Sequence, residues 1–223
     1  MAITLRGTSQ PALTSTSITI PFTTVANDMI VLVVGSANAN WSNGSSTFPN
    51  NTTVTWSGLG ATWTSFALNS ATNNGYAVWI GTGCTAGLTT ITRSGTPAST
   101  TGTYALAQFS GVASIAYYSS ILINATSNST ASTTVSYNQG QLLLATAESF
   151  TWATTTGTWN GVADTLAVQS GTSRIPLIDY LISPSTQSGV TYTTPRSAFG
   201  QNFNAGQAFV IKPAVSSNFL SFM

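Results

Sequence analysis

The chain contains no histidine and very few charged residues of either sign. Its 223 residues include 5 Lys and Arg and 4 Asp and Glu, so charged residues make up only 4% of the sequence. An ordinary soluble domain has about 25%. The absence of histidine excludes the usual general base, the Ser-His-Asp triad and the commonest zinc ligand. We therefore expect a protein that is not an enzyme and that has no catalytic residues, cofactor or metal.

Disulfides, membrane spans and clusters of basic residues are also lacking. A single cysteine excludes an intrachain disulfide. No segment approaches the run of about 20 apolar residues that a transmembrane helix needs. The start, "MAITLRGTSQ", has no apolar segment of signal-peptide length. The 5 basic residues are scattered, whereas binding to phosphates needs them clustered. We expect no membrane partner, no nucleic-acid partner and no secretory signal.

Serine, threonine, asparagine and glycine take the place of the missing charges. The formal net charge is +1, and a net charge near zero favours association between copies because little repulsion keeps them apart. The composition therefore favours a protein that works within an assembly.

Short apolar segments rich in Val, Ile, Thr and aromatic residues recur along the chain, and helical periodicity is nearly absent. Gly, Asn, Ser or Pro bound these segments, which is typical of β-strands. Their number and spacing predict an all-β fold. The predicted strands are residues 15–22, 28–37, 52–58, 61–70, 75–81, 88–94, 103–111, 131–137, 140–150, 164–170, 175–183, 189–195 and 205–213.

The predicted strands form two sets with parallel patterns. With an offset of 102 residues, "YAVWIGTGCTAGLTTIT" aligns with "IDYLISPSTQSGVTYTT", and Gly87 matches Gly189 as a turn residue with positive φ. This predicts a jelly-roll-like antiparallel β-sandwich of about eight or more strands with an internal two-fold pseudo-repeat. We expect one domain over residues 1–213, with halves at 15–112 and 131–213 that complete one sandwich, joined by a linker (111–130) that packs on it.

The residues give little support to two alternatives in which the protein would have a phosphate-binding or catalytic site. The segment "GTGCTAG" around Cys84 lacks the spacing of a dinucleotide fingerprint, and a predicted strand follows it. No base is present to activate the thiol. A hydrolase would need two carboxylates facing a cleft. Among the acidic residues, Asp28 and Asp164 have structural positions, and the remaining two could pair with Arg174 or Arg196. The acidic residues are Asp28, Glu148, Asp164 and Asp179.

Aromatic and apolar residues outside the predicted strands are the candidate partner contacts. Some lie in the polar insertion 38–51, some flank the loop "ATTTGT", and some lie in the apolar tail 214–223. Exposed aromatics of this kind stack on sugar rings or anchor protein interfaces. The alternative is that each folds back onto its own sandwich. The candidates are Trp41, Phe48, Trp152, Trp159, Phe219, Leu220 and Phe222.

Four segments resemble a group of phage virion structural proteins of the jelly-roll type. They are "MAITLRGTSQPALTSTSITIPFTTVANDMIVLVV", "GLGATWTSF", "YAVWIGTGCTAGLTTIT" and "ALAQFSGV". The resemblance covers most of residues 1–112 and, more loosely, 131–213. It implies a protein made in the host cytoplasm and carried on the extracellular virion. Its partners would be other virion proteins, including the major capsid protein, and copies of itself.

The resemblance leaves two places in the virion open. The first is a capsid decoration, cement or minor capsid protein that acts through subunit interfaces. The alternative is a tail- or fibre-associated module that binds a host glycan through loop aromatics. In the first case, the apolar tail is expected to dock on a neighbouring subunit or on its own sheet.

Overall fold

The computed structural model describes residues 2–10, 17–36, 54–67, 76–95, 102–123, 131–149, 158–169, 175–194 and 204–215. These residues form strands and no helix, which confirms the predicted all-β fold. None of the elements in these ranges is a helix that could cross a membrane. The strands are β1 (Thr4–Ser9), β2 (Ser17–Thr19), β3 (Met29–Ser36), β4 (Val54–Gly58), β5 (Thr62–Ala67), β6 (Tyr76–Thr82), β7 (Thr90–Gly95), β8 (Gly102–Ser110), β9 (Val112–Ile123), β10 (Ala131–Tyr137), β11 (Leu142–Ser149), β12 (Thr158–Trp159), β13 (Val162–Ala163), β14 (Thr165–Gln169), β15 (Ile175–Ile182), β16 (Gln187–Thr194) and β17 (Asn204–Pro213).

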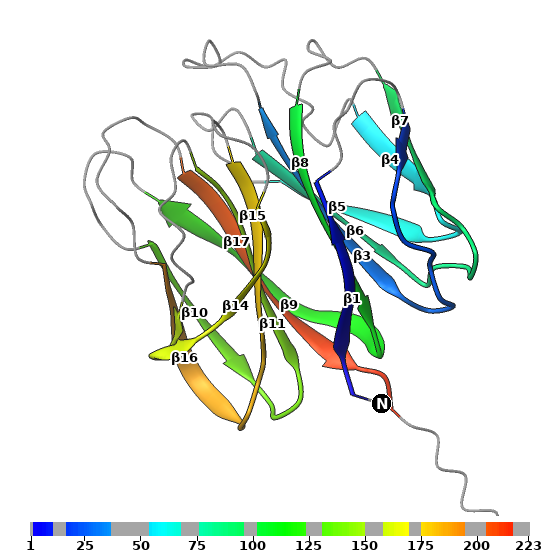
Figure 1. Ribbon diagram of the computed structural model, residues 1–223. Coiled ribbons are helices and arrows are strands. Elements are labelled where there is room, and N and C mark those ends of the chain that lie inside the picture. Colours follow the sequence, from blue (N-terminus) through cyan, green and yellow to red (C-terminus); the bar gives the residue numbers. More distant parts are fainter. Residues whose placement is uncertain are drawn as a thin grey trace, which may run out of the picture.

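The strands form four antiparallel sheets, two in each half of the chain. The N-terminal inner sheet has the order β1-β8-β3-β6-β5, and the N-terminal outer sheet has the order β2-β7-β4. The C-terminal inner sheet has the order β14-β15-β11-β17-β9, and the C-terminal outer sheet has the order β10-β16-β12-β13. Figure 1 shows these sheets as four layers, with the two inner sheets facing each other in the middle of the molecule.

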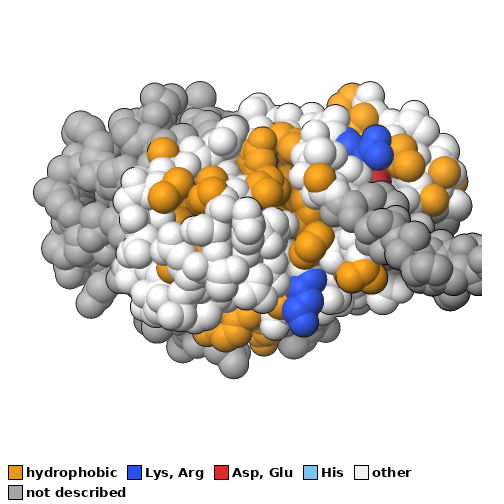
Figure 2. Space-filling model, turned by 90° about the horizontal axis from the view of Figure 1, so that it is seen from below, with side chains coloured by type: hydrophobic (Ala, Val, Ile, Leu, Met, Phe, Trp, Pro, Cys, Tyr) orange, Lys and Arg blue, Asp and Glu red, His pale blue; other side chains and the backbone are white. Residues whose placement is uncertain are grey.

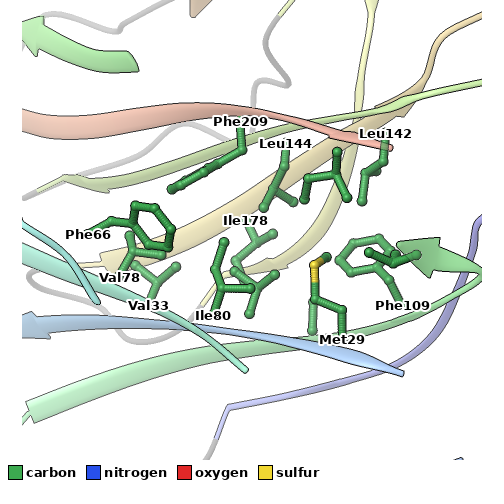
Figure 3. Close-up of a cluster of buried hydrophobic side chains, with 14 of the residues drawn as sticks. Met29, Val33, Phe66, Val78, Ile80, Phe109, Leu142, Leu144, Ile178 and Phe209 are labelled. Atoms are coloured by element: carbon green, nitrogen blue, oxygen red, sulfur yellow. The ribbon is translucent and has the colours of Figure 1, made fainter. Parts of the chain in front are cut away.

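The two inner sheets enclose a shared core. Side chains from β3, β5, β6 and β8 meet side chains from β11, β15 and β17 in this layer. In Figure 3, Met29, Val33 and Phe109 point from the N-terminal inner sheet toward the other layer, where Leu142 and Phe209 lie. The shared core therefore holds the two halves together by apolar burial, which is the largest favourable term in folding.

Each half also has a buried cluster of its own between its inner and outer sheets. In the N-terminal half, Leu32 and Trp79 of the inner sheet pack with Trp56 and Ile91 of the outer sheet. In the C-terminal half, the corresponding cluster includes Leu143 and Val210 from the inner sheet and Val190 from the outer sheet. Each half thus forms a two-sheet sandwich, where the sequence analysis expected the halves to complete one sandwich together.

The double burial of the inner sheets explains the continuous apolar runs in the sequence. Every residue of "MIVLVV", Met29 to Val34, is buried. Alternate residues of β3 point to opposite faces, so Val31 and Val33 enter the shared core while Leu32 and Val34 enter the N-terminal cluster. A strand covered on both faces needs apolar residues at successive positions, as predicted for this segment.

The two halves have the same strand order in both of their sheets. In the inner sheets, the order β1-β8-β3-β6-β5 corresponds strand by strand to the order β9-β17-β11-β15-β14. In the outer sheets, the order β2-β7-β4 corresponds to β10-β16-β12. Cross-strand pairs follow this match, because Met29 pairs with Phe109 and Leu142 pairs with Ile211.

The offset between matched strands varies along the chain. The pairs just given keep the predicted offset of 102 between β8 and β17. In the outer sheets, Trp56 pairs with Arg93 and Trp159 pairs with Tyr192. This gives an offset of 99 between β7 and β16, so the single predicted register does not extend through these strands. Unequal turns between the strands are the physical reason.

Gly87 and Gly189 both have positive φ, of 84° and 65°, as predicted. Their places differ, however, because Gly87 lies in the turn before β7 whereas Gly189 lies inside β16. The amide of Gly189 donates to Ser136 Oγ at 3.2 Å, beside a register shift between β10 and β16. The two glycines are therefore not equivalent turn positions.

Three features of the strand pattern were not predicted. The segment "TLRGTS" forms β1, and Thr158–Trp159 with Val162–Ala163 form the short strands β12 and β13. Residues 112–123, inside the expected linker, form β9 at one edge of the C-terminal inner sheet. Only Gly111, with φ of 72°, separates β8 from β9, so the chain passes between the two inner sheets through a single residue.

Candidate binding site at the edge of the C-terminal half

Most of the candidate contact residues lie outside the described residues. This applies to Trp41, Phe48, Trp152, Phe219, Leu220 and Phe222. Trp159 is described, and its exposed fraction is 0%. The prediction that Trp159 contacts a partner therefore does not match its position inside the C-terminal cluster.

The burial of Trp159 follows from its place in a strand. Trp159 pairs with Tyr192 across β12 and β16, and the two ring centroids lie 4.7 Å apart. Trp56 has the matching place in the N-terminal half and packs edge-on against Trp79, with centroids 6.0 Å apart. Trp56 and Trp79 are buried and Trp63 is partly buried, as expected for tryptophans in strand patterns.

The glycine-rich segment around Cys84 forms a turn and has no reactive thiol. Cys84 is buried in the N-terminal cluster, and its amide donates to the carbonyl oxygen of Asp28 at 3.1 Å. Burial, together with the nearby Asp28 charge, raises the pKa of the thiol from its ordinary 9.0 to about 11. The thiol is therefore protonated at neutral pH, and a protonated thiol is a poor nucleophile.

Asp28 stabilises the turn that leads into β3. Its Oδ1 lies 3.4 Å from Arg6 Nε, and its Oδ2 accepts hydrogen bonds from the Gln108 side chain and, at 3.3 Å, from the Val25 amide. The Asp28 side chain is 2% exposed and the Arg6 side chain is 44% exposed. This carboxylate is held by three donors inside the fold, which is a structural role.

The other acidic residues do not form a catalytic pair in the described part of the structure. Asp164 and Asp179 are buried, and Asp179 accepts a hydrogen bond from the Tyr192 hydroxyl at 3.4 Å. The side chain of Glu148 lies outside the described residues, as do Arg174 and Arg196, its suggested partners. Within the described ranges, no group of three or more His, Cys, Asp or Glu side chains could hold a metal ion.

An open hollow of about 520 Å³ lies at the edge of the C-terminal half. It is situated between β9 and β17 of the inner sheet and β10 and β16 of the outer sheet. Among the described residues, the lining has one exposed aromatic ring, several amides and hydroxyls, apolar side chains and one cation, and it includes no carboxylate. The main polar and aromatic contributors are Tyr117, Tyr137, Asn138, Gln141, Gln187 and Lys212.

Tyr117 and Tyr118 are adjacent on β9 and point to opposite faces of the sheet. Tyr117 pairs with Val210, lines the hollow and is 47% exposed. Tyr118 lies at the margin of the shared core, where its ring meets Phe66 edge-on at 5.0 Å and stacks on Phe209 at 6.3 Å. Tyr118 is 53% exposed but does not line the hollow, so Tyr117 is the exposed ring that a ligand in the hollow would meet.

The floor of the hollow is held in place by a turn. Gln141 Oε1 accepts a hydrogen bond from the Asn138 amide at 2.7 Å, and Gln141 itself is buried. The Ser183 hydroxyl donates to the Asn138 carbonyl oxygen at 2.5 Å and accepts from the Gln141 amide at 3.0 Å. Burial raises the pKa of the Tyr137 hydroxyl, so this group stays protonated and can donate.

Most of the described surface of the molecule is uncharged. On the face in Figure 2, hydrophobic and uncharged polar side chains cover most of the described surface, and charged side chains are sparse. A ligand that meets this surface is therefore recognised mainly by hydrogen bonds and ring contacts. Long-range electrostatic attraction contributes little.

Sequence reasoning missed the hollow because its residues come from four separate strands and their turns. None of them lies in the loops or the tail that the sequence analysis singled out. One signal was available: "TWSGLGAT" in the first half and "TWNGVADT" in the second share the pattern T-W-x-G-x-x-x-T. This pattern matches β4 with β12, and it would have assigned Trp159 to the core of its own half, as Trp56 belongs to the core of the other half.

Comparisons with known proteins do not identify the chain. No protein-family model, curated protein or solved structure matches it.

Proposed function

We propose that the chain is a non-enzymatic structural protein of a phage virion, acting on the capsid exterior as a decoration or cement protein. Its partners are the major capsid protein and further copies of the chain. The resemblance of residues 1–112 to phage virion proteins supports this, and so does the low charge of the sequence. The strand order of the N-terminal half supports this interpretation, since β1-β8-β3-β6 facing β2-β7-β4 resembles the connectivity of a jelly roll, with β5 added beside β6.

The observation that carries the proposal is the edge strand β9. It runs from Val112 to Ile123 at the end of the C-terminal inner sheet, and no described strand pairs with its outer edge. Its sequence, "VASIAYYSSILI", has no charge and no proline. Soluble monomers usually protect edge strands with charged residues, prolines or bulges, because an open edge pairs with other chains. Pairing with β17 is irregular in the first part of β9, whereas residues 117–123 pair in one unbroken register. This uncharged and regular part of the edge suits a protein whose edge is covered in an assembly.

The tail- or fibre-associated alternative depended on loop aromatics. Trp159, one of these residues, is fully buried. The others lie outside the described residues, so no geometry favours them. The capsid location therefore remains the proposal that the edge strand supports best.

Purified virions of the phage that encodes the chain test this proposal. Quantitative mass spectrometry should detect the chain at many copies per particle, and immunogold labels should lie on the capsid. Particles that lack the chain should lose their DNA at a lower temperature than wild-type particles. Labels confined to the tail would favour the alternative, and absence from virions would refute both.

A further inference from the structure

We propose that the hollow of the C-terminal half binds a sugar residue of a glycan, with Tyr117 as the stacking surface and Lys212 as the contact for a sugar carboxylate. This inference goes beyond the proposed virion role and does not depend on it. The hollow belongs to the folded chain and can be tested on the purified protein.

The chemistry of the lining suits a carbohydrate. A sugar ring has apolar C–H faces that pack on an aromatic ring, and it has hydroxyls at its edges that need donors and acceptors. Tyr117 supplies an exposed ring, and the side-chain amide of Asn138 supplies donors and an acceptor. The Gln187 amide bonds Ser185 and Asn160 and has one further N–H and one further lone pair for a ligand. The volume of about 520 Å³ lies within the range of about 300–1,000 Å³ that small-molecule sites have.

The charge of the lining narrows the class of sugar. Lys212 lines the hollow, and in the part of the chain that the structure describes no carboxylate does. An ammonium group without an opposing carboxylate in the lining attracts an anionic ligand, and a hydrogen bond between two charged groups is stronger than a neutral one. We therefore expect glycans with a carboxylated sugar, such as a sialic acid or a hexuronic acid, to bind more tightly than neutral glycans.

The matching place in the N-terminal half shows that the fold does not require a hollow here. Gly7 of β1 matches Tyr117 of β9. Each residue follows the register irregularity of its strand, and Gly7 pairs with Gln108 as Tyr117 pairs with Val210 in the matching strand. The ring of Phe22 packs so closely on Gly7 that a Cβ there would lie 2.8 Å from it. A tyrosine at this position would therefore require the Phe22 ring to move.

Polar groups complete the closure of the N-terminal half. Arg6 matches Ala116, because each lies at the register irregularity of its edge strand, β1 or β9. Asp28 matches Gln141, because each directly precedes a central strand, β3 or β11. The Arg6–Asp28 ion pair, with Gln108 on the same carboxylate, lies at the positions that match two lining residues of the hollow, Ala116 and Gln141. The C-terminal half has small or neutral residues at these positions and an exposed tyrosine beside them. The C-terminal half therefore has an exposed ring and no ion pair at these positions, which leaves them available to a ligand.

A glycan array with labelled wild-type protein tests the proposal. The array should contain neutral, sialylated, uronate-containing and sulfated glycans. We expect binding to a subset with carboxylated sugars, and titration calorimetry on the strongest of them supplies the reference affinity. Absence of binding to any glycan overturns the proposal. Binding led by sulfated glycans of every sequence contradicts the carboxylate assignment, because it indicates general attraction to anions.

Substitutions then locate the site. Tyr117→Ala should weaken binding about tenfold, whereas Tyr117→Phe keeps the ring and should bind nearly as well as the wild type. Lys212→Ala should weaken binding of carboxylated glycans about three- to tenfold and leave neutral ones unchanged. Leu88→Ala is the matched control, because Leu88 is also exposed, at 41%, but lies in the N-terminal half. Unchanged affinity of folded Tyr117→Ala protein would place the ligand elsewhere and overturn the proposal.

Discussion

The two halves of this chain share a strand order but differ at one matched place. In the N-terminal half, Arg6 forms an ion pair with Asp28, and the ring of Phe22 packs on Gly7 of β1. In the C-terminal half, the space beside β9 is an open hollow lined by Tyr117. The arrangement of strands is therefore compatible with either state, and the side chains at a few positions decide which one forms.

The comparison separates residues that maintain the fold from residues that are available for binding. Buried residues with matching partners in both halves, such as Trp56 and Trp159, serve the packing of each sandwich. Tyr117 has no counterpart of its kind, since glycine has its place in the other half. A side chain that is exposed and present in only one half is a better candidate for function than a buried one present in both.

The largest expected effect comes from the two matched tryptophans. Trp56→Ala and Trp159→Ala should each lower the free energy of unfolding by about 3–5 kcal/mol, because each leaves a large cavity between two sheets. Replacement by Phe should cost less, since neither indole N–H has a hydrogen-bond partner in the described structure. Urea denaturation followed by circular dichroism measures this. A loss below about 1 kcal/mol for Trp159→Ala would contradict its assignment to the core.

The ion pair of the N-terminal half should have the next largest effect. Arg6→Ala leaves the buried Asp28 carboxylate with two donors instead of three and should cost about 1–3 kcal/mol. Gln141→Ala is the matched change in the C-terminal half. It removes one hydrogen bond to the Asn138 amide and should cost about 0.5–1.5 kcal/mol. If Arg6→Ala costs less than Gln141→Ala, the ion pair does not stabilise the closed half.

Alkaline pH should weaken the N-terminal half through two buried groups. Burial raises the pKa of Cys84 from 9.0 to about 11 and that of Tyr104 from 10.0 to about 12. Each group favours folding while it stays neutral, so its contribution is complete below the unfolded-state pKa and is lost as the pH rises through the folded-state pKa. Stability should therefore fall between about pH 9 and pH 12.

Denaturation midpoints at a series of pH values measure this decline. Cys84→Ala removes one of the two groups and should delay its onset, while Tyr104 still lowers stability above pH 10. The same onset in Cys84→Ala and wild-type protein would show that the thiol plays no part.

The smallest expected effect on stability is at Tyr117, which sharpens the contrast with its neighbour. Tyr117→Ala should change the free energy of unfolding by less than about 0.5 kcal/mol, because the side chain faces the open hollow and not the shared core. Tyr118→Ala should cost about 1–2 kcal/mol, because its ring contacts Phe66 and Phe209 across the shared core. Equal effects of the two substitutions in thermal denaturation would contradict these assignments.

The strands could be predicted from sequence because their apolar residues are local signals. The run from Met29 to Val34 indicated a strand covered on both faces, and the structure has it in an inner sheet. By contrast, two edge strands were not predicted. The pattern of β1 is polar, and the composition of β9 suggested a linker, although both strands pair with strands in the observed sheets. Edge strands have few local constraints, so their sequences resemble those of loops.

The candidate site could not be predicted because it depends on register. Tyr117, Gln141 and Lys212 come together only when β9, β11 and β17 pair in the observed alignment. Sequence reasoning favoured tryptophans near polar loops, and Trp159 shows the weakness of that criterion. Its neighbours look loop-like, yet the pairing of β12 with β16 turns its ring into the core.

The most direct test of the difference between the halves is to close the hollow with residues from the closed half. Ala116→Arg combined with Gln141→Asp places in the C-terminal half the pair that Arg6 and Asp28 form in the N-terminal half. Calorimetric titration with the best glycan from the array then compares this variant with the wild type. We expect a folded protein that has lost glycan binding. A folded variant that binds the glycan with wild-type affinity would show that these positions do not decide whether the site is open.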